Sequence, residues 1–319
     1  MKRDEITFEQ VIARGCGIDV HKKVIVATIR GTGLQEQTLS FDSFTSSLEK
    51  LRNWLNKNQV THIAMESTGV YWKPLFNILE SDFEIILVNA RHIKNVPGQK
   101  TDKKDSKWIA KLLLSGLLKG SFIPPKPIRN LRDLTRYRRK ITGQVASEKN
   151  RIQKILEDTN IKLSSVVSDM SGSTATKIIN AMIAGQVDVD VLVEFRHGKM
   201  QASKEELAAS LKGYFTDHHR FMLTTIKASL RDKEILIQTI DERIDEYLKA
   251  NELEVDAQLL QTVPGIGKDA ASGILAEIGA DMERFPDEKH LASWAGMCPG
   301  NNESAGKKKV AGQPMGTNT

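Results

Sequence analysis

Residues 15–20 have the sequence Gly-Cys-Gly-Ile-Asp-Val, a short apolar run with one acidic residue, Asp19, near its end. β-rich segments follow at 23–30 and 35–41. Runs of this length and composition, separated by turn residues, predict three strands joined as a meander. An acidic residue inside an apolar strand needs a partner or an ion to offset its burial, so Asp19 is a candidate functional residue.

Outward from this meander, helical and strand patterns alternate. Apolar residues three and four positions apart predict helices, and continuous apolar runs predict buried strands. The predicted helices cover 44–55, 72–80 and 101–118, and the predicted strands cover 60–65 and 83–88. Three hairpin-connected strands followed by alternating helices and strands predict an α/β fold with a mixed sheet.

The segment Pro124-Pro125-Lys126-Pro127 marks a predicted domain boundary, because three prolines in four residues interrupt helices and central strands. Beyond it, long helices are predicted over 128–161 and 219–251. The second has a heptad pattern that only Lys233 breaks. The two helices fit either an intermolecular coiled coil or a helical hairpin within one chain. The intervening residues 164–212 are predicted to be helical and carry no chemical signal.

A last compact unit is predicted from residue 256. Its Pro264-Gly265-Ile266-Gly267 segment, between apolar helical patterns, predicts a helix-hairpin-helix, although Gly-x-Gly turns also join helices in proteins that bind no DNA. Gly265, Gly267 and Lys268 are candidate contacts to DNA phosphates. The predicted domains are therefore 1–123, 124–255 and 256–319, with a polar, glycine-rich tail after Pro299 that is expected to be poorly ordered.

The composition is that of an ordinary globular protein, with 40% hydrophobic residues among 319. The two cysteines, Cys16 and Cys298, are far apart and predict neither a disulfide framework nor a zinc site. Residues 1–5 mix both charges and lead into no apolar segment, and no later run approaches the length of a membrane span. We therefore expect a cytoplasmic protein without membrane contact.

Positive charge is concentrated in one part of the chain. Between Arg91 and Arg151 there are 17 Lys and Arg residues against 4 Asp and Glu residues, whereas the rest of the chain is mildly acidic. This distribution is typical of a surface that contacts a phosphate backbone, although a solvated basic helix face is the alternative. The candidate nucleic-acid-binding residues of the segment are Lys103, Lys104, Lys107, Arg132, Arg136, Arg138, Arg139 and Lys140.

Four acidic residues are candidates for a metal site: Asp19, Glu66, Asp102 and Asp105. Glu66 ends a predicted strand, and the spacing of Asp102 and Asp105 places both on one face near a helix N-terminus. Carboxylates on converging elements suit Mg²⁺, and a pair of ions supports phosphoryl transfer on DNA. Taken singly, each has a structural alternative, as a turn or cap residue.

Three stretches of the chain resemble the DEDD-type transposases of insertion sequences, the group that includes the DNA invertase Piv: Gly17-Ile18-Asp19-Val20-His21-Lys22, Met65-Glu66-Ser67-Thr68-Gly69-Val70-Tyr71-Trp72 and 100–110. The resemblance implies an RNase H-like (RuvC-like) fold with Asp19, Glu66, Asp102 and Asp105 as the metal-binding set, two Mg²⁺ ions or Mn²⁺ in their place, and activity in DNA transposition. It further implies a homo-oligomer, a dimer or tetramer, that exchanges active-site parts, and a structured guide RNA.

Residues 285–307 resemble the second domain of the same transposases. The resemblance implies that Ser304 is the nucleophile that forms a covalent link to a DNA phosphate. By its surroundings alone Ser304 is a loop serine, because no His or Asp base lies at a diagnostic spacing. Family members usually continue with a basic helical segment, whereas this chain ends at Thr319, so we expect a truncated C-terminal domain.

Other functions fit parts of the pattern. A metal-dependent nuclease or junction resolvase would use the same fold with water as the nucleophile. An actin-like ATPase or sugar kinase also begins with a Gly-x-Asp strand, but Val20-His21-Lys22-Lys23 follows here instead of phosphate-binding glycines and hydroxyls. A DNA-binding remnant without activity is the third alternative. The transposase is expected in a bacterial or archaeal cell, associated with the nucleoid.

Overall fold

The computed structural model of the 319-residue chain describes residues 10–67, 69–89, 106–118 and 120–297, with the backbone of 303–304 and 307–308. The chain divides into two compact units, Met1–Ile123 and Pro124–Thr319. This division falls at the first proline of the segment 124–127. The further boundary between residues 255 and 256 stays a prediction.

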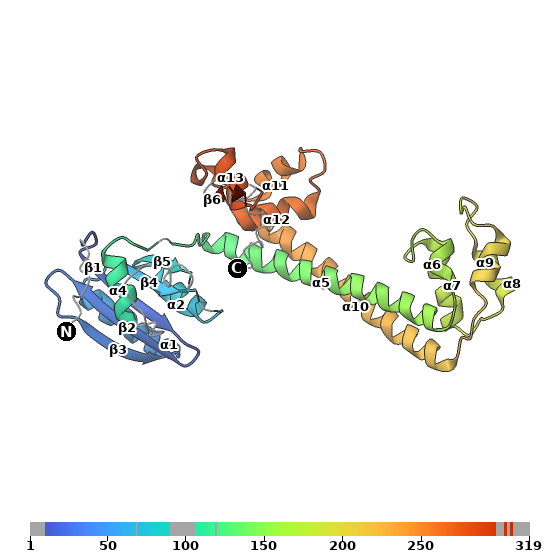
Figure 1. Cartoon of the computed structure of the whole chain (residues 1–319), viewed down its shortest axis with the longest axis horizontal. Coiled ribbons are helices and arrows are strands. Elements are labelled where there is room, and N and C mark those ends of the chain that lie inside the picture. Colours follow the sequence, from blue (N-terminus) through green and yellow to red (C-terminus); the bar gives the residue numbers. More distant parts are fainter. Residues whose placement is uncertain are drawn as a thin grey trace. The chain divides into compact units, whose positions relative to one another are not determined.

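The first unit is built on a five-stranded sheet (Figure 1). Its strands are β1 (Arg14–Val20), β2 (Val24–Gly31), β3 (Gln37–Asp42), β4 (His62–Glu66) and β5 (Glu84–Val88). Their spatial order is β3-β2-β1-β4-β5. The first three pair antiparallel, whereas β4 runs parallel to β1 and β5 runs parallel to β4. The predicted α/β class with a mixed sheet is confirmed.

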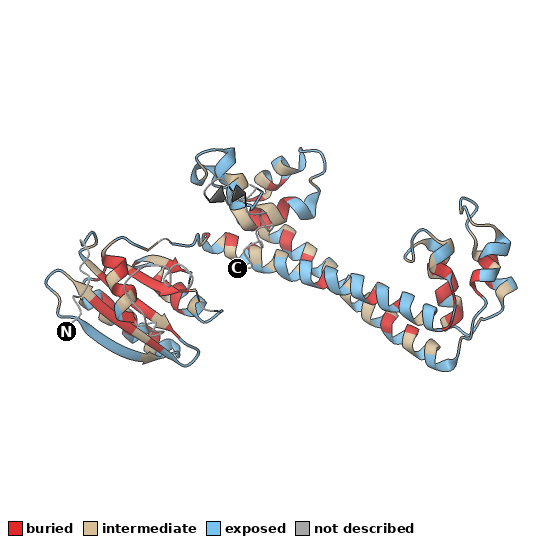
Figure 2. Ribbon diagram, viewed as in Figure 1, coloured by how far each residue is buried: buried red, intermediate tan, exposed pale blue. Residues whose placement is uncertain are grey.

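Helices cover both faces of this sheet. Helices α1 (Thr45–Lys57) and α2 (Trp72–Leu79) pack on one face, and α4 (Ser106–Leu114) packs on the other. Since side chains alternate between faces along a strand, Met65 joins the core beneath α1 and α2, while its neighbour Ala64 joins the apolar cluster beneath α4. Figure 2 shows the buried strands between the helices.

Helix α4 ends earlier than the sequence pattern predicts. The prediction spans 101–118, but the helix stops at Leu114, because Gly116 adopts a φ of 64° and its N–H donates to the Leu113 carbonyl. A left-handed glycine is a common helix terminator. The predicted residues 101–105 lie outside the described part of the chain.

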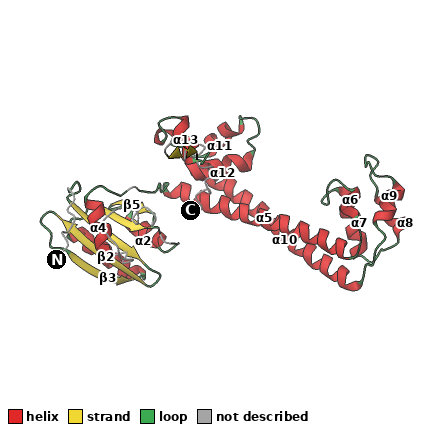
Figure 3. Ribbon diagram, viewed as in Figure 1, coloured by secondary structure: helices red, strands yellow, loops and turns green. Residues whose placement is uncertain are grey.

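Two long helices dominate the second unit (Figure 3). Helices α5 (Lys126–Asp158) and α10 (Asp217–Ala250) pack along each other and match the predicted helices 128–161 and 219–251 closely. They run antiparallel, since Arg138 in the first half of α5 contacts Asp241 in the second half of α10, and Asp158 at the end of α5 contacts His219 in the first turn of α10. Pro127 lies in the first turn of α5, where a proline removes no helical hydrogen bond.

Shorter helices follow each long one. Between α5 and α10 lie α6 (Leu163–Val166), α7 (Ser173–Ile183), α8 (Val189–Leu192), a 3₁₀ turn (Val193–Phe195) and α9 (Lys204–Ser210). These helices share an apolar core with the adjoining ends of α5 and α10. The helical structure predicted for 164–212 is therefore present.

The remaining elements are α11 (Glu254–Gln261), α12 (Lys268–Ile278), a 3₁₀ turn (Met282–Arg284), α13 (Glu288–Trp294), and the antiparallel strands β6 (Glu303–Ser304) and β7 (Lys307–Lys308). Apart from these two short strands, the tail after Pro299 lies outside the described residues. Within the described ranges, no helix combines the length and the apolar composition that crossing a membrane requires.

Candidate active site

The structure brings two of the four predicted carboxylates, Asp19 and Glu66, to one edge of the sheet. Ile18 of β1 pairs with Met65 of β4 in a parallel register, so the next residues, Asp19 and Glu66, are neighbours at the carboxyl ends of adjacent strands. Parallel strands lie about 4.8 Å apart. Because Ile18 and Met65 face the core beneath α1 and α2, Asp19 and Glu66 face the side that α4 covers.

Both carboxylates are shielded from solvent to a large extent. The side chain of Asp19 is 15% exposed, and Glu66 is 3% exposed. His21 Nε2 lies 3.0 Å from Asp19 Oδ2, while its own side chain is 65% exposed. The N–H of His21 donates to the Val24 carbonyl and closes the hairpin between β1 and β2. His21 thus holds one orientation of Asp19, a role that the sequence pattern did not indicate.

The start of α4 is fixed over the same face. A Cβ atom added at Gly17 would lie 2.2 Å from both the Ser106 carbonyl oxygen and the Ala110 nitrogen, so only glycine allows this approach. The hydroxyl of Ser106 lies 2.6 Å from that of Thr28 on β2, which is also 2.9 Å from the hydroxyl of Thr38. Both Thr28 and Ser106 are buried.

This hydroxyl cluster was missed in the sequence, although a lone threonine in the apolar run of β2 is a weak signal for it. Its position matters because Ser106 directly follows Asp105 in the chain. Asp102, Asp105, Lys103 and Lys104 themselves lie outside the described residues. Among the residues that are described, no three His, Cys, Asp or Glu side chains gather as a metal site.

Two parts of the chain match families of known proteins. Residues 16–161, which include all four predicted carboxylates, match a family model described as "Transposase" of the DEDD type. Residues 257–316, which include Ser304, match the model "Transposase IS116/IS110/IS902 family". The chain belongs to the DEDD-type transposases of insertion sequences. Enzymes of this family act on DNA, so this transposase has DNA as its partner.

Individual relatives share less than a third of their aligned residues with this transposase. The pilin gene-inverting proteins of Moraxella lacunata and Moraxella bovis are each 23% identical to this transposase over 299 residues, which is 90% of the chain and 73% of each relative. The mini-circle putative transposase for IS117 of Streptomyces coelicolor is 29% identical over 126 residues, 37% of the chain and 30% of that relative.

Three of the arginines predicted to bind nucleic acid contact the transposase itself. Arg132 donates to the carbonyls of Ala276 and Glu277 at the end of α12, at 2.8 Å each. Arg136 forms two hydrogen bonds with the Glu277 carboxylate, at 2.8 and 2.9 Å. Arg138 pairs with Asp241 on α10 and with Asp269 near the start of α12.

These contacts tie both ends of α12 to α5. Although burial opposes ionisation of Glu277, the hydrogen bond from Arg136 and the charges of Arg132 and Arg136 hold the pKa of this carboxyl below its usual range. Arg139 and Lys140 are exposed on α5. In the first unit, Lys107 lies 3.4 Å from Glu36. The binding of nucleic acid by all these residues stays a prediction.

The turn between α11 and α12 is exposed. Gly265 has a φ of 90°, and Gly267 precedes the first residue of α12. A Cβ atom at either glycine would meet no atom within 4 Å, so the backbone is open to a ligand. Lys268 pairs with Asp245 of α10. The exposed turn is compatible with the predicted contact with a phosphate, and that contact stays a prediction.

Ser304 belongs to the second unit, in strand β6, where it pairs with Lys307 of β7. The two carboxylates belong to the first unit. The predicted catalytic role of Ser304 stays a prediction.

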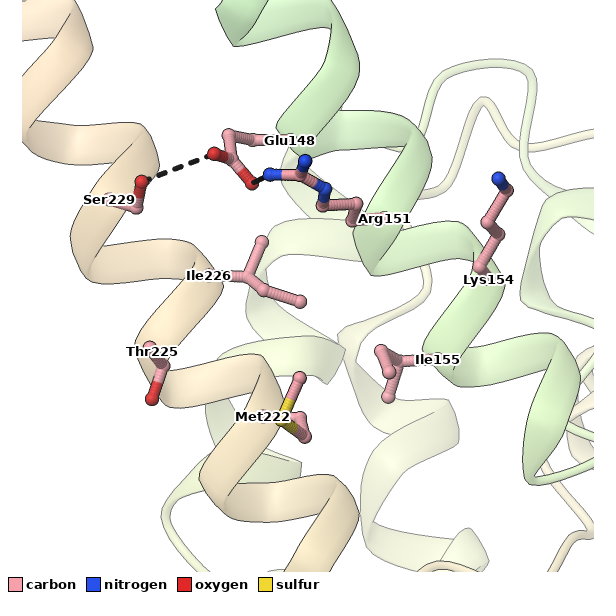
Figure 4. A pocket seen from close by; sticks show the side chains of 8 residues that line it. All are labelled: Glu148, Arg151, Lys154, Ile155, Met222, Thr225, Ile226 and Ser229. Carbon is pink, nitrogen blue, oxygen red and sulfur yellow. Dashed lines mark hydrogen bonds and ion pairs between the residues drawn. The ribbon is translucent and has the colours of Figure 1, made fainter.

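A groove between α5 and α10 carries a charged cluster (Figure 4). Glu148, which is 6% exposed, accepts hydrogen bonds from Arg151 at 2.9 Å and Ser229 at 3.2 Å, and pairs with Lys233 at 3.2 Å. The lysine that breaks the heptad pattern is therefore matched by a buried glutamate. The floor of the groove is formed by Ile155, Met222 and Ile226. The cluster therefore joins α5 to α10.

Proposed function

We propose that this transposase cuts and rejoins DNA strands for an insertion sequence, in a metal-dependent reaction at the edge of the sheet where Asp19 and Glu66 lie. The observation that carries the proposal is the parallel register that makes these two carboxylates neighbours on the face covered by α4. The strand order and the antiparallel meander followed by parallel strands are compatible with an RNase H-like, RuvC-like sheet.

The residues fit the cation that the family implies. Mg²⁺ prefers oxygen ligands, and two carboxylates from adjacent strands provide them. Asp102 and Asp105 would complete the set, because the chain enters α4 at Ser106, which is held over the same face by Thr28 and Gly17. Two Mg²⁺ ions bound there, or Mn²⁺ in their place, would stabilise negative charge on the reacting phosphate.

The chain's own residues supply position and nucleophile. Asp19 and Glu66 hold their oxygens at fixed points on the sheet, and His21 orients Asp19. In our proposal the hydroxyl oxygen of Ser304 forms a bond to phosphorus and gives up its proton, while the bond from phosphorus to one bridging oxygen breaks and that oxygen leaves as a hydroxyl. Rejoining reverses these changes with a different strand end.

The second unit would hold the nucleic acids. We propose that Arg139 and Lys140 on α5, and Gly265, Gly267 and Lys268 in a helix-hairpin-helix, contact phosphates of DNA or of a structured guide RNA. Arg132, Arg136 and Arg138 would do so only by exchanging contacts within the protein. We further propose that α5 and α10 act as a coiled-coil arm of a homo-oligomer, with three domains bounded near 123 and 255.

A metal-binding and cleavage assay tests the carboxylate site. Asp19→Asn and Glu66→Gln should each reduce Mg²⁺-dependent strand cleavage of the cognate element ends by at least about a hundredfold, because each removes an ionic ligand. Calorimetric titration with Mn²⁺ should show weaker binding in the same variants. The matched control is Glu84→Gln on β5, whose side chain is 71% exposed. Equal Mn²⁺ affinity in all three variants would contradict the proposal.

Trapping of a covalent adduct tests Ser304. The chain incubated with labelled DNA ends and Mg²⁺ should give a protein-DNA adduct that is stable to denaturation and absent in Ser304→Ala. Ser293→Ala, in α13 of the same unit, is the control and should retain the adduct. Cleavage by Ser304→Ala at the rate of the unchanged chain, with no adduct in either, would instead identify a hydrolytic nuclease.

A further inference from the structure

Two exposed loops flank the candidate carboxylates at the same edge of the sheet. The hairpin between β1 and β2 begins two residues after Asp19, and the loop that leads into α2 begins directly after Glu66. Since β1 and β4 are adjacent and parallel, both loops leave the sheet at its carboxyl edge (Figure 1). In open α/β sheets this edge is where ligands bind.

The hairpin carries positive charge. Lys22 and Lys23 stand at its tip, which the bond from the His21 N–H to the Val24 carbonyl closes, and both are exposed. Neither forms an ion pair with another described residue. A strand whose phosphate approaches Asp19 and Glu66 meets negative charge, and two lysines beside these carboxylates lower that repulsion.

The second loop carries apolar surface. Val70 is 64% exposed and Tyr71 is 42% exposed, whereas Leu75 and Leu79, farther along in α2, are completely buried. The helix therefore packs without the Tyr71 ring. Gly69 has a φ of 57°, and a Cβ atom there would lie 3.8 Å from the edge of the Tyr71 ring. The ring is supported by this turn and still faces solvent.

An aromatic ring and exposed cations at the same edge of a sheet match the chemistry of single-stranded nucleic-acid sites. Bases stack on aromatic side chains while lysines contact the backbone, and such stacking tolerates any base because every base has a π face. A base in an intact duplex is already stacked on its neighbours, so only an unpaired base is available to the ring.

We propose that Tyr71, with Val70 beside it, is a stacking platform for an unpaired base of the DNA strand that reaches the carboxylates, and that Lys22 and Lys23 hold the flanking phosphates. The proposal rests on the proposed function, because the reaction there brings a DNA strand to this edge. It adds that the strand is unpaired next to the phosphate that is cut, and it names positioning residues outside the metal site.

Binding in EDTA tests this platform apart from any cleavage. The full chain is titrated with fluorescent oligothymidylate and with an oligomer of the same length that carries abasic sites. Tyr71→Ala should weaken binding of oligothymidylate about tenfold, which is within the range for stacking on one ring, and leave the abasic oligomer unaffected. Tyr71→Phe, which keeps the ring, should bind as the unchanged chain does.

The lysines have a different signature. Lys22→Gln with Lys23→Gln should weaken binding of both oligomers equally and lower the slope of log affinity against log salt by about 1.4, at roughly 0.7 per phosphate of a single strand. Thermal unfolding of each variant checks that the fold is kept.

Three results would overturn the platform: unchanged affinity in Tyr71→Ala, an equal loss for both oligomers, or a dependence on Tyr71 for oligouridylate alone, which would assign the ring to RNA. Glu66→Gln should keep the Tyr71-dependent binding, because no metal is present. If the unchanged chain showed no Mg²⁺-dependent cleavage, the proposed function would be wrong. The binding measured in EDTA would still test the Tyr71 platform by itself.

Discussion

The carboxyl edge of the sheet and the N-terminal part of α5 are both rich in charge, but the partners of their charged side chains differ. At the sheet edge, Asp19 and Glu66 remain together on one face, as the proposed reaction requires. On α5, Arg132, Arg136 and Arg138 are used to hold α12 and α10. Charge in the sequence therefore locates a functional site only where the backbone also fixes the direction of the side chains.

The difference has a simple origin. In a parallel pair of strands, register and alternation determine both the neighbour and the face of each residue. On a helix, a long arginine side chain reaches several positions, and the partner depends on which other helix packs nearby. Three predictions sharpen this comparison.

The largest effect is expected at Gly17, where the sheet and α4 meet. Gly17→Ala places a methyl group 2.2 Å from two backbone atoms of α4, so the helix has to move. We expect a loss of about 3 kcal/mol in the free energy of unfolding, the upper part of the range for overpacking. Chemical denaturation measures this loss, and strand cleavage should fall with it.

The matched control for this change lies on the arm. Gly143 is exposed within α5, and a Cβ atom there would meet nothing within 4 Å. Gly143→Ala should therefore stabilise the chain by about 0.5–1 kcal/mol, because alanine favours a helix over glycine. If both substitutions changed the free energy of unfolding in the same direction, α4 would not lie as close to Gly17 as the structure shows.

An intermediate effect is expected at Arg132. Arg132→Ala leaves two carbonyls at the end of α12 without their donor and should cost about 2 kcal/mol of unfolding free energy. Arg139→Ala, two turns farther along α5 and exposed, should change stability by less than about 0.5 kcal/mol. Arg139→Ala should instead weaken DNA binding, measured by salt titration. The reverse pattern would show that Arg132 is a nucleic-acid contact.

The smallest effect is expected at Ser106. Ser106→Ala removes its hydroxyl from the pair with Thr28 and should cost about 1 kcal/mol. It should also raise the Mg²⁺ concentration at which cleavage is half-maximal, since the start of α4 is less firmly held. Ser115→Ala is the control, because Ser115 directly follows α4 and its hydroxyl donates to the Lys111 carbonyl in the last turn of that helix. An identical Mg²⁺ requirement in both variants would remove Ser106 from the site.

Much of the first unit was predictable because its elements are short and strongly patterned. The meander and the strand that ends at Glu66 agree with the structure, and in the second unit the two long helices agree as well. The end of α4 was placed too late, since its apolar pattern continues past Leu114 and only Gly116 in a left-handed conformation stops the helix.

The helical arm shows a second limit of pattern alone. Lys233 interrupts the heptad pattern, and Glu148 on the facing helix pairs with it. The two residues are distant in the sequence, and nothing local to either indicates the other. The same is true of Thr28 and Ser106.

The sequence by itself indicated the family, through the resemblance of its motifs to known transposases. It also gave the order of the strands along the chain and the acidic residues near the ends of two of them, because alternation and spacing are properties of local chain geometry. Only the tertiary structure decided that β1 and β4 are neighbours in register and that α4 lies against Gly17. It also decided that three arginines of α5 pair with residues of α10 and α12. Those features depend on contacts between segments far apart in the chain, and a linear pattern does not encode which segments meet.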